Sequence, residues 1–173
     1  MSVDELKARI RDVPDFPKPG IVFKDIMPLL ADPAGLARTV DLLAEWAEPR
    51  EPDLILGAEA RGFITGGALA CRLRCGFVAA RKPGKLPWRT VSAKYALEYG
   101  FDTLELHADA IIRGQRVLIH DDVLATGGTA KAKTELVEQL GGEVVGLAFI
   151  ISLDFLNGRD RLAGYDVHSL IQY

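Results

Sequence analysis

Short apolar runs alternate with longer amphipathic segments along most of the 173-residue chain. The apolar runs are typical of strands buried in a parallel sheet, and the amphipathic segments are typical of helices. Strands are predicted at 53–57, 77–80, 117–121, 144–151 and 167–171, and helices at 33–48, 63–73 and 129–140. This order predicts an α/β fold with a mainly parallel, twisted sheet, helices on both faces, and ligands at the carboxyl ends of the strands.

The N-terminal segment predicts a helix from Ser2 to Val13. Ser2 and Glu5 have the spacing of a capping box, and the apolar residues that follow recur at helical intervals. The next stretch, 14–20, holds three prolines and a glycine. That composition predicts an ordered connector, because proline cannot donate a hydrogen bond inside a helix or a central strand.

The segment from Lys82 to Leu106 breaks the alternation of strands and helices. It contains prolines and glycines, and its best strand pattern is the short Leu104–Leu106. Long irregular insertions in compact domains usually serve function, most often as lids. We therefore predict a flexible, functional loop or hairpin over 82–106.

Composition predicts one folded domain over 1–173. Apolar residues make up 49% and charged residues 26% of the chain, which is ordinary for a globular protein. The net charge of −3 argues against nucleic acid as the main partner. No apolar run has the length of a membrane span, and no signal or transit peptide is recognisable, so we expect a cytoplasmic protein without a membrane partner. Cys71 and Cys75 have no nearby third ligand, so free thiols are expected rather than a zinc site.

The strongest chemical pattern is VLIHDDVLATGGT at 117–129. Asp121 and Asp122 follow a strand and are expected at its exposed end, before a turn of small residues that opens a helix. Free backbone N–H groups and the helix dipole make such a turn an anion site. The pattern is neither a Walker loop nor a dinucleotide fingerprint. Two acids beside a phosphate site imply a ligand with hydroxyl groups or a hydroxyl-bound metal, and ribose 5-phosphate fits; the alternative is an ordinary turn with solvated acids.

Three further clusters follow the predicted strands. GAEARGF at 57–63 is a second possible anion site with Arg61, although a tight turn with a solvated arginine would explain it alone. Arg81, Lys82 and Lys85 form a cationic run, which is either a solvated surface or the counter-charge of a second phosphate group. LEYG at 97–100 places an acid and a tyrosine in the expected lid.

Together these motifs resemble the adenine phosphoribosyltransferase family, within the type I phosphoribosyltransferases. The resemblance covers PDFPKPGIVFKDI at 14–26, GAEARGF at 57–63, the stretch from RKPGKLP to LEYG at 81–100, and the motif at 117–129. It implies a Rossmann-like fold with an N-terminal base-binding hood within 1–35 and a flexible catalytic loop. It also implies a homodimer, Mg²⁺ as cofactor, and a reaction of adenine with phosphoribosyl pyrophosphate that gives AMP and pyrophosphate.

The resemblance also implies roles for individual residues. The catalytic residues would be Glu98, Asp121 and Asp122. The 5-phosphate would be held by Ala125, Thr126, Gly127, Gly128 and Thr129. The pyrophosphate would be held by Glu59, Ala60, Arg61, Arg81, Lys82, Lys85 and Tyr99. The adenine would be held by Val22, Phe23, Lys24 and Leu153. Mg²⁺ would be bound through substrate and water, with no direct protein ligand.

Two positions depart from the family pattern, His120 before the acids and Met27 after the hood. His120 could act as a general base, but neighbours on a strand face opposite ways, so a packing role is the favoured interpretation. Two other functions remain open at this stage. One is a phosphoribosyltransferase for a 6-oxopurine, because the backbone would read the purine edge. The other is a non-catalytic module that senses phosphoribosyl pyrophosphate.

Overall fold

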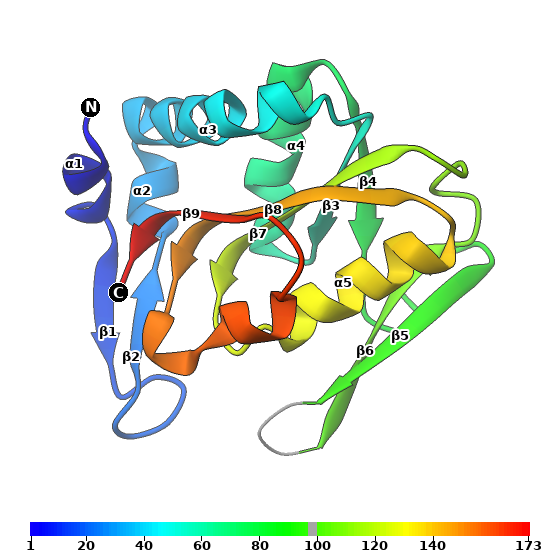
Figure 1. Ribbon diagram of the computed structural model, residues 1–173. Coiled ribbons are helices and arrows are strands. Elements are labelled where there is room, and N and C mark those ends of the chain that lie inside the picture. The colour runs from blue at the N-terminus through cyan, green and yellow to red at the C-terminus, as the bar shows by residue number, and fades with distance from the viewer. Residues whose placement is uncertain (97–99) are drawn as a thin grey trace.

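The computed structural model describes residues 1–96 and 100–173 (Figure 1). Its centre is a five-stranded sheet in the order β4-β3-β7-β8-β9, and every neighbouring pair is parallel. The strands are β3 (Leu54–Ala58), β4 (Gly76–Ala80), β7 (Arg116–Leu124), β8 (Glu143–Ser152) and β9 (Val167–Gln172). The expected parallel sheet is therefore confirmed.

Helices cover both faces of this sheet (Figure 1). One face packs against α3 (Pro33–Ala47) and α4 (Arg61–Leu73), and the other against α5 (Gly128–Gln139). Within β7, Leu118 is buried on the side of α3 and α4, and Ile119 is buried on the side of α5. Side chains alternate between the two faces along a strand, which explains this arrangement. Among the described residues, no helix is both long enough and apolar enough to span a membrane.

The N-terminal region differs from the predicted helix. The capping box of Ser2 and Glu5 is present, but α1 covers only Val3–Lys7. The chain then forms β1 (Arg11–Pro14), which pairs antiparallel with β2 (Val22–Asp25), and α2 (Met27–Ala31) follows. Arg11 bonds Asp25, and Lys24 bonds Asp12, so ion pairs across the hairpin accompany the strand pairing. Tertiary pairing has overridden the helical periodicity of this segment.

The segment 82–106, predicted as a loop or hairpin, contains a hairpin that is longer and better packed than its short strand pattern indicated. Its second half is an antiparallel hairpin of β5 (Thr90–Ala96) and β6 (Phe101–His107). Ala93, Leu104 and Leu106 are buried in the same core as α5, and an isolated bridge between Arg81 and Glu105 ties the hairpin to the end of β4. The remaining short helices are η1 (Glu48–Arg50), η2 (Asp154–Leu156) and η3 (Gly158–Leu162).

Candidate functional site

The predicted anion site lies at the junction of β7 and α5. A cavity of about 90 Å³ there is lined by all five residues proposed to hold a 5-phosphate, Ala125, Thr126, Gly127, Gly128 and Thr129, together with the acid Asp121. The α-helix begins at Gly128, so its first N–H groups have no partner within the helix. These amides and the helix dipole favour an anion in this small cavity, which we call the phosphate cradle.

Gly127 is the position where the phosphate cradle depends on glycine. Its φ is +81°, in the left-handed region that L side chains rarely adopt. A Cβ atom at this position would lie 2.3 Å from the carbonyl oxygen of Gly158, the first residue of η3. The backbone of the cradle therefore packs directly against the backbone of η3, and any side chain at position 127 would prevent this contact.

The two acids lie inside β7 rather than at its exposed end. The strand continues to Leu124 and pairs with β8 as far as Ser152. Asp122 is only 6% exposed. The expectation that both acids would be solvent-accessible at the end of the strand is wrong, because the sheet extends beyond the apolar run that marked the strand in the sequence.

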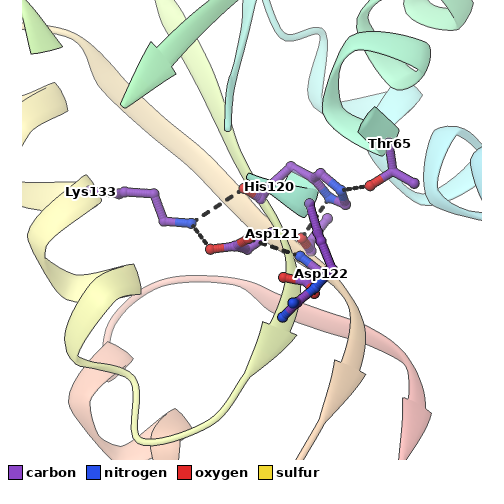
Figure 2. Close-up of polar contacts among 7 residues, drawn as sticks. Thr65, His120, Asp121, Asp122 and Lys133 are labelled. Carbon is purple, nitrogen blue, oxygen red and sulfur yellow. Dashed lines mark hydrogen bonds and ion pairs between the residues drawn. The ribbon is translucent and has the colours of Figure 1, made fainter. Parts of the chain in front are cut away.

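Each acid has its own cation, and the two cations come from helices on opposite faces of the sheet; Figure 2 shows the pair of Asp121 and Lys133. On the α5 side, Lys133 Nζ lies 2.8 Å from Asp121 Oδ2 and 3.3 Å from the carbonyl oxygen of His120. Lys133 is completely buried. Lys133 was not predicted as a site residue, although its spacing from Leu136 and Leu140 places it on the apolar face of the helix.

On the α4 side, the guanidinium of Arg61 bonds the carboxylate of Asp122. Burial raises the pKa of Asp122, the charge of Asp121 raises it further, and Arg61 opposes both effects. The Arg61 side chain is 41% exposed, and its guanidinium carbon lies 5.3 Å from the centre of the Phe23 ring. Arg61 can therefore exchange Asp122 for an incoming anion, whereas buried Lys133 has no such freedom.

His120 is a buried structural residue. Its Nε2 lies 2.7 Å from the Thr65 hydroxyl (Figure 2). Its Nδ1 lies 2.9 Å from the carbonyl oxygen of Ala148. The carbonyl can only accept, so Nδ1 carries the proton and Nε2 accepts from Thr65. Burial lowers the pKa of His120 to about 4, which keeps the ring neutral. The packing role favoured from the sequence is confirmed.

This neutral histidine predicts a stability effect. The pKa of His120 falls from 6.5 to about 4 on folding, so protonation favours the unfolded state and stability is lost as pH falls from 6.5 to 4. The loss should reach about 3 kcal/mol. Denaturant unfolding measures the free energy of unfolding across this pH range. For His120→Gln this free energy should fall less between pH 6.5 and 4, by the amount that His120 contributes. Equal profiles for the two proteins would show that His120 does not stay neutral in the fold.

The residues proposed for pyrophosphate gather at the ends of β3 and β4. Glu59 bonds Arg81, with Oε2 at 2.9 Å from Nη2, and accepts the backbone N–H of Lys82 at 2.6 Å. The Lys82 amide and the Arg81 guanidinium lower the pKa of Glu59. Glu59 is thus an acid that orients cations. A cis peptide bond joins Glu59 to Ala60, the residue before α4.

The other members of this group lie toward the hairpin. Lys82 Nζ is 3.3 Å from Asp102 of β6, and the Tyr95 hydroxyl donates to the same carboxylate at 3.2 Å. Lys85 is exposed, and its carbonyl accepts from Arg81. Glu98 and Tyr99, the proposed catalytic acid and its neighbour, lie outside the described residues.

A second cavity, of about 300 Å³, lies beside the acids. It is lined by the four residues proposed for adenine, Val22, Phe23, Lys24 and Leu153, and also by Ile21, Arg61, Asp122, Val123 and Ala125. The hairpin β1–β2 forms one wall and the loop after β8 forms another. We call this the base cavity. Val123 escaped the sequence analysis because it was placed beyond the end of its strand.

The described residues fit an Mg²⁺ ion that is held mainly by its ligand. No group of three His, Cys, Asp or Glu side chains in the described part of the chain is placed to hold a metal. The carboxylates of Asp121 and Asp122 supply oxygen atoms of the kind that Mg²⁺ prefers, but each already has a cationic partner. Mg²⁺ usually keeps several waters and binds substrate phosphates, so an ion here would need few protein ligands.

Comparison with known proteins gives a consistent result. The phosphoribosyl transferase domain family matches residues 25–169. The adenine phosphoribosyltransferase of Koribacter versatilis is 61% identical over 98% of this chain and 93% of its own length. That of Acidobacterium capsulatum is 58% identical, covering all of this chain and 96% of its own.

Solved structures of the same family superpose closely. The adenine phosphoribosyltransferase of Thermoanaerobacter pseudethanolicus matches with a TM-score of 0.97 and 53% identity, over 99% of this chain and all of its own. The enzyme of Saccharomyces cerevisiae, solved with an imino-altritol bisphosphate and adenine, matches with a TM-score of 0.93 and 40% identity, over 97% of both chains. The fold is that of the type I phosphoribosyltransferases. From the parallel sheet, the phosphate cradle and these matches together, the chain belongs to the adenine phosphoribosyltransferase family.

Proposed function

We propose that this protein acts in purine salvage, transferring the 5-phosphoribosyl group of phosphoribosyl pyrophosphate to adenine to give AMP and pyrophosphate. One observation carries the proposal. Asp121 lines the phosphate cradle, and the adjacent Asp122 lines the base cavity. A ligand with a phosphate group in the first cavity and a purine in the second would place its ribose hydroxyl groups at the two carboxylates.

Complexes of relatives support this ligand. The yeast structure contains adenine, and that of a Trypanosoma brucei relative, 25% identical, contains AMP, pyrophosphate and ribose 5-phosphate. In this chain the backbone of Val22 and Lys24 would read the purine edge, Phe23 would stack on its face, and Leu153 would contact the other side. We further propose a cytoplasmic homodimer, as the family resemblance implies.

The charges fit the chemistry of an anomeric centre. Glycosyl transfer develops positive charge on the sugar ring, which Asp121 and Asp122 would stabilise. Arg61, Arg81, Lys82 and Lys85 would receive the pyrophosphate. Mg²⁺, when bound, neutralises charge on the pyrophosphate. By resemblance, Glu98 and Tyr99 would complete the site from the loop, where exclusion of water protects the substrate from hydrolysis.

An assay of substrate choice tests the proposal. Adenine, hypoxanthine and guanine are each incubated with phosphoribosyl pyrophosphate and Mg²⁺, and nucleotide formation is followed by chromatography. We expect AMP from adenine and little product from the two 6-oxopurines, which present the opposite hydrogen-bonding pattern. A preference for hypoxanthine or guanine would show that the substrate is a 6-oxopurine and not adenine. Binding of phosphoribosyl pyrophosphate without any product would favour the sensing module.

A further inference from the structure

The phosphate cradle contains an electrostatic conflict. Its amides and helix dipole favour an anion, yet the acidic residue Asp121 lines the same cavity of about 90 Å³. A carboxylate within a few ångströms of a phosphate group repels it strongly where water is scarce. An acid in this position is compatible with phosphate binding only if its charge is balanced nearby.

Lys133 is placed to balance that charge. Its ammonium lies 2.8 Å from Asp121 Oδ2, and the Lys133 side chain is completely buried between α5 and the sheet. The other carboxylate oxygen, Oδ1, accepts the backbone N–H of Asp122 at 3.0 Å. Both oxygens of Asp121 are thus fixed from within the protein, as Figure 2 shows for the lysine contact.

The remaining charges nearby do not substitute for Lys133. Arg61 is bonded to Asp122 from the α4 side, and His120 is neutral. Within the described residues, Lys133 is therefore the cation that contacts Asp121.

We propose that Lys133 is a positioning residue for substrate binding: it orients Asp121 and cancels its charge, so that a sugar phosphate can bind beside an acid. The inference rests on the proposed function, because it takes the cradle to hold a 5-phosphate. Lys133 itself stays buried and touches no substrate. Its effect on the ligand passes through Asp121.

The test measures binding without turnover. Calorimetry with ribose 5-phosphate, at pH 8 and with a chelator present, reports affinity for the cradle alone. Lys133→Met leaves Asp121 uncompensated, and affinity should fall by at least about tenfold, because the unbalanced carboxylate repels the phosphate group. Lys131→Met is the matched control. It removes the same charge from the same helix, but Lys131 Nζ lies toward the Tyr165 ring, 5.4 Å from its centre, so affinity should stay unchanged.

A second variant separates charge balance from mere stability. In Lys133→Met/Asp121→Asn both charges are absent, and affinity for ribose 5-phosphate should return to near the wild-type value, although turnover should not. A purely structural lysine predicts a lower melting temperature and no such rescue. If Lys133→Met does not fold, Lys133→Gln keeps polar contacts without the charge and should show the same loss.

The outcomes are distinct. Wild-type affinity in Lys133→Met, or no recovery in the double variant, would overturn the inference and leave the proposed function standing. A wild-type protein that turns adenine over but does not bind ribose 5-phosphate would overturn the inference, because the cradle would then not be a 5-phosphate site. A wild-type protein that does neither would overturn the proposed function together with the inference.

Discussion

An Asp122→Asn variant should fold as stably as the wild type and yet lose at least about a hundredfold in kcat/KM for adenine. Asparagine has nearly the same shape and can still accept a hydrogen bond from Arg61. The Arg61 side chain is 41% exposed, so the arginine is hydrated when its partner loses charge. What disappears is the negative charge beside the base cavity, where the sugar ring becomes cationic in the transition state.

The neighbouring acid provides an internal comparison. Asp121→Asn should also lose turnover, but it should destabilise the fold by about 3 kcal/mol, because it leaves the ammonium of Lys133 buried without a counter-charge. Steady-state kinetics and denaturant unfolding measure the two effects separately. Asp109→Asn, an exposed acid in a turn, serves as control and should change neither. Full activity in Asp122→Asn would mean that this acid does not act on the substrate.

Gly127→Ala is expected to abolish the phosphate cradle. The new methyl group would lie 2.3 Å from the carbonyl oxygen of Gly158, and φ at +81° is strained for alanine. The turn must shift, so the amides that face the cavity move away from the anion. Loss of two charge-assisted hydrogen bonds, about 1.5 kcal/mol each, lowers affinity for ribose 5-phosphate by about a hundredfold.

Gly114→Ala is the matched control for backbone strain. Gly114 has φ of +86° but nothing within 4 Å of an added Cβ atom. This variant should lose about 1 kcal/mol of stability and no affinity. Calorimetry with ribose 5-phosphate and a thermal melt of both variants test the pair. Should Gly127→Ala bind as tightly as Gly114→Ala, the close approach to Gly158 is not what shapes the cradle.

The elements of the central sheet were predictable because each carries a local signal. Buried parallel strands are continuous apolar runs, and the helices between them are amphipathic; α3 is followed by Pro49 and α5 by Gly141. The phosphate cradle was predictable for the same reason, since strand, turn and helix start form one continuous segment at 117–129. Local chemistry decides local structure there.

The N-terminal hairpin was not predictable in this way. The segment 2–13 has helical periodicity, and the helix stops at Lys7 because the following residues pair with Val22–Asp25. That pairing depends on residues beyond the window in which periodicity is read. The hairpin β5–β6 has the same origin, because its strands are stabilised by packing on α5.

The ion pairs of the two acids were also not predicted from the sequence. Lysine is usually exposed, so Lys133 in the middle of an amphipathic helix was not taken as a buried residue. Its position on the apolar face was visible, but its partner Asp121 lies on another element. Asp121 and Asp122 are neighbours on β7, so their side chains point to opposite faces of the sheet. Lys133 of α5 therefore pairs with Asp121, and Arg61 of α4 pairs with Asp122.

The base cavity joins β2, near the start of the chain, to the loop that follows β8. As the chain leaves the ribosome, the segment that forms the phosphate cradle emerges in one piece, before Leu153 has been added. The two walls of the base cavity can meet only afterwards, when a long loop closes at a cost in chain entropy. The residues proposed to contact the sugar phosphate therefore lie in one local segment, whereas those proposed to contact the purine are brought together only by the completed fold.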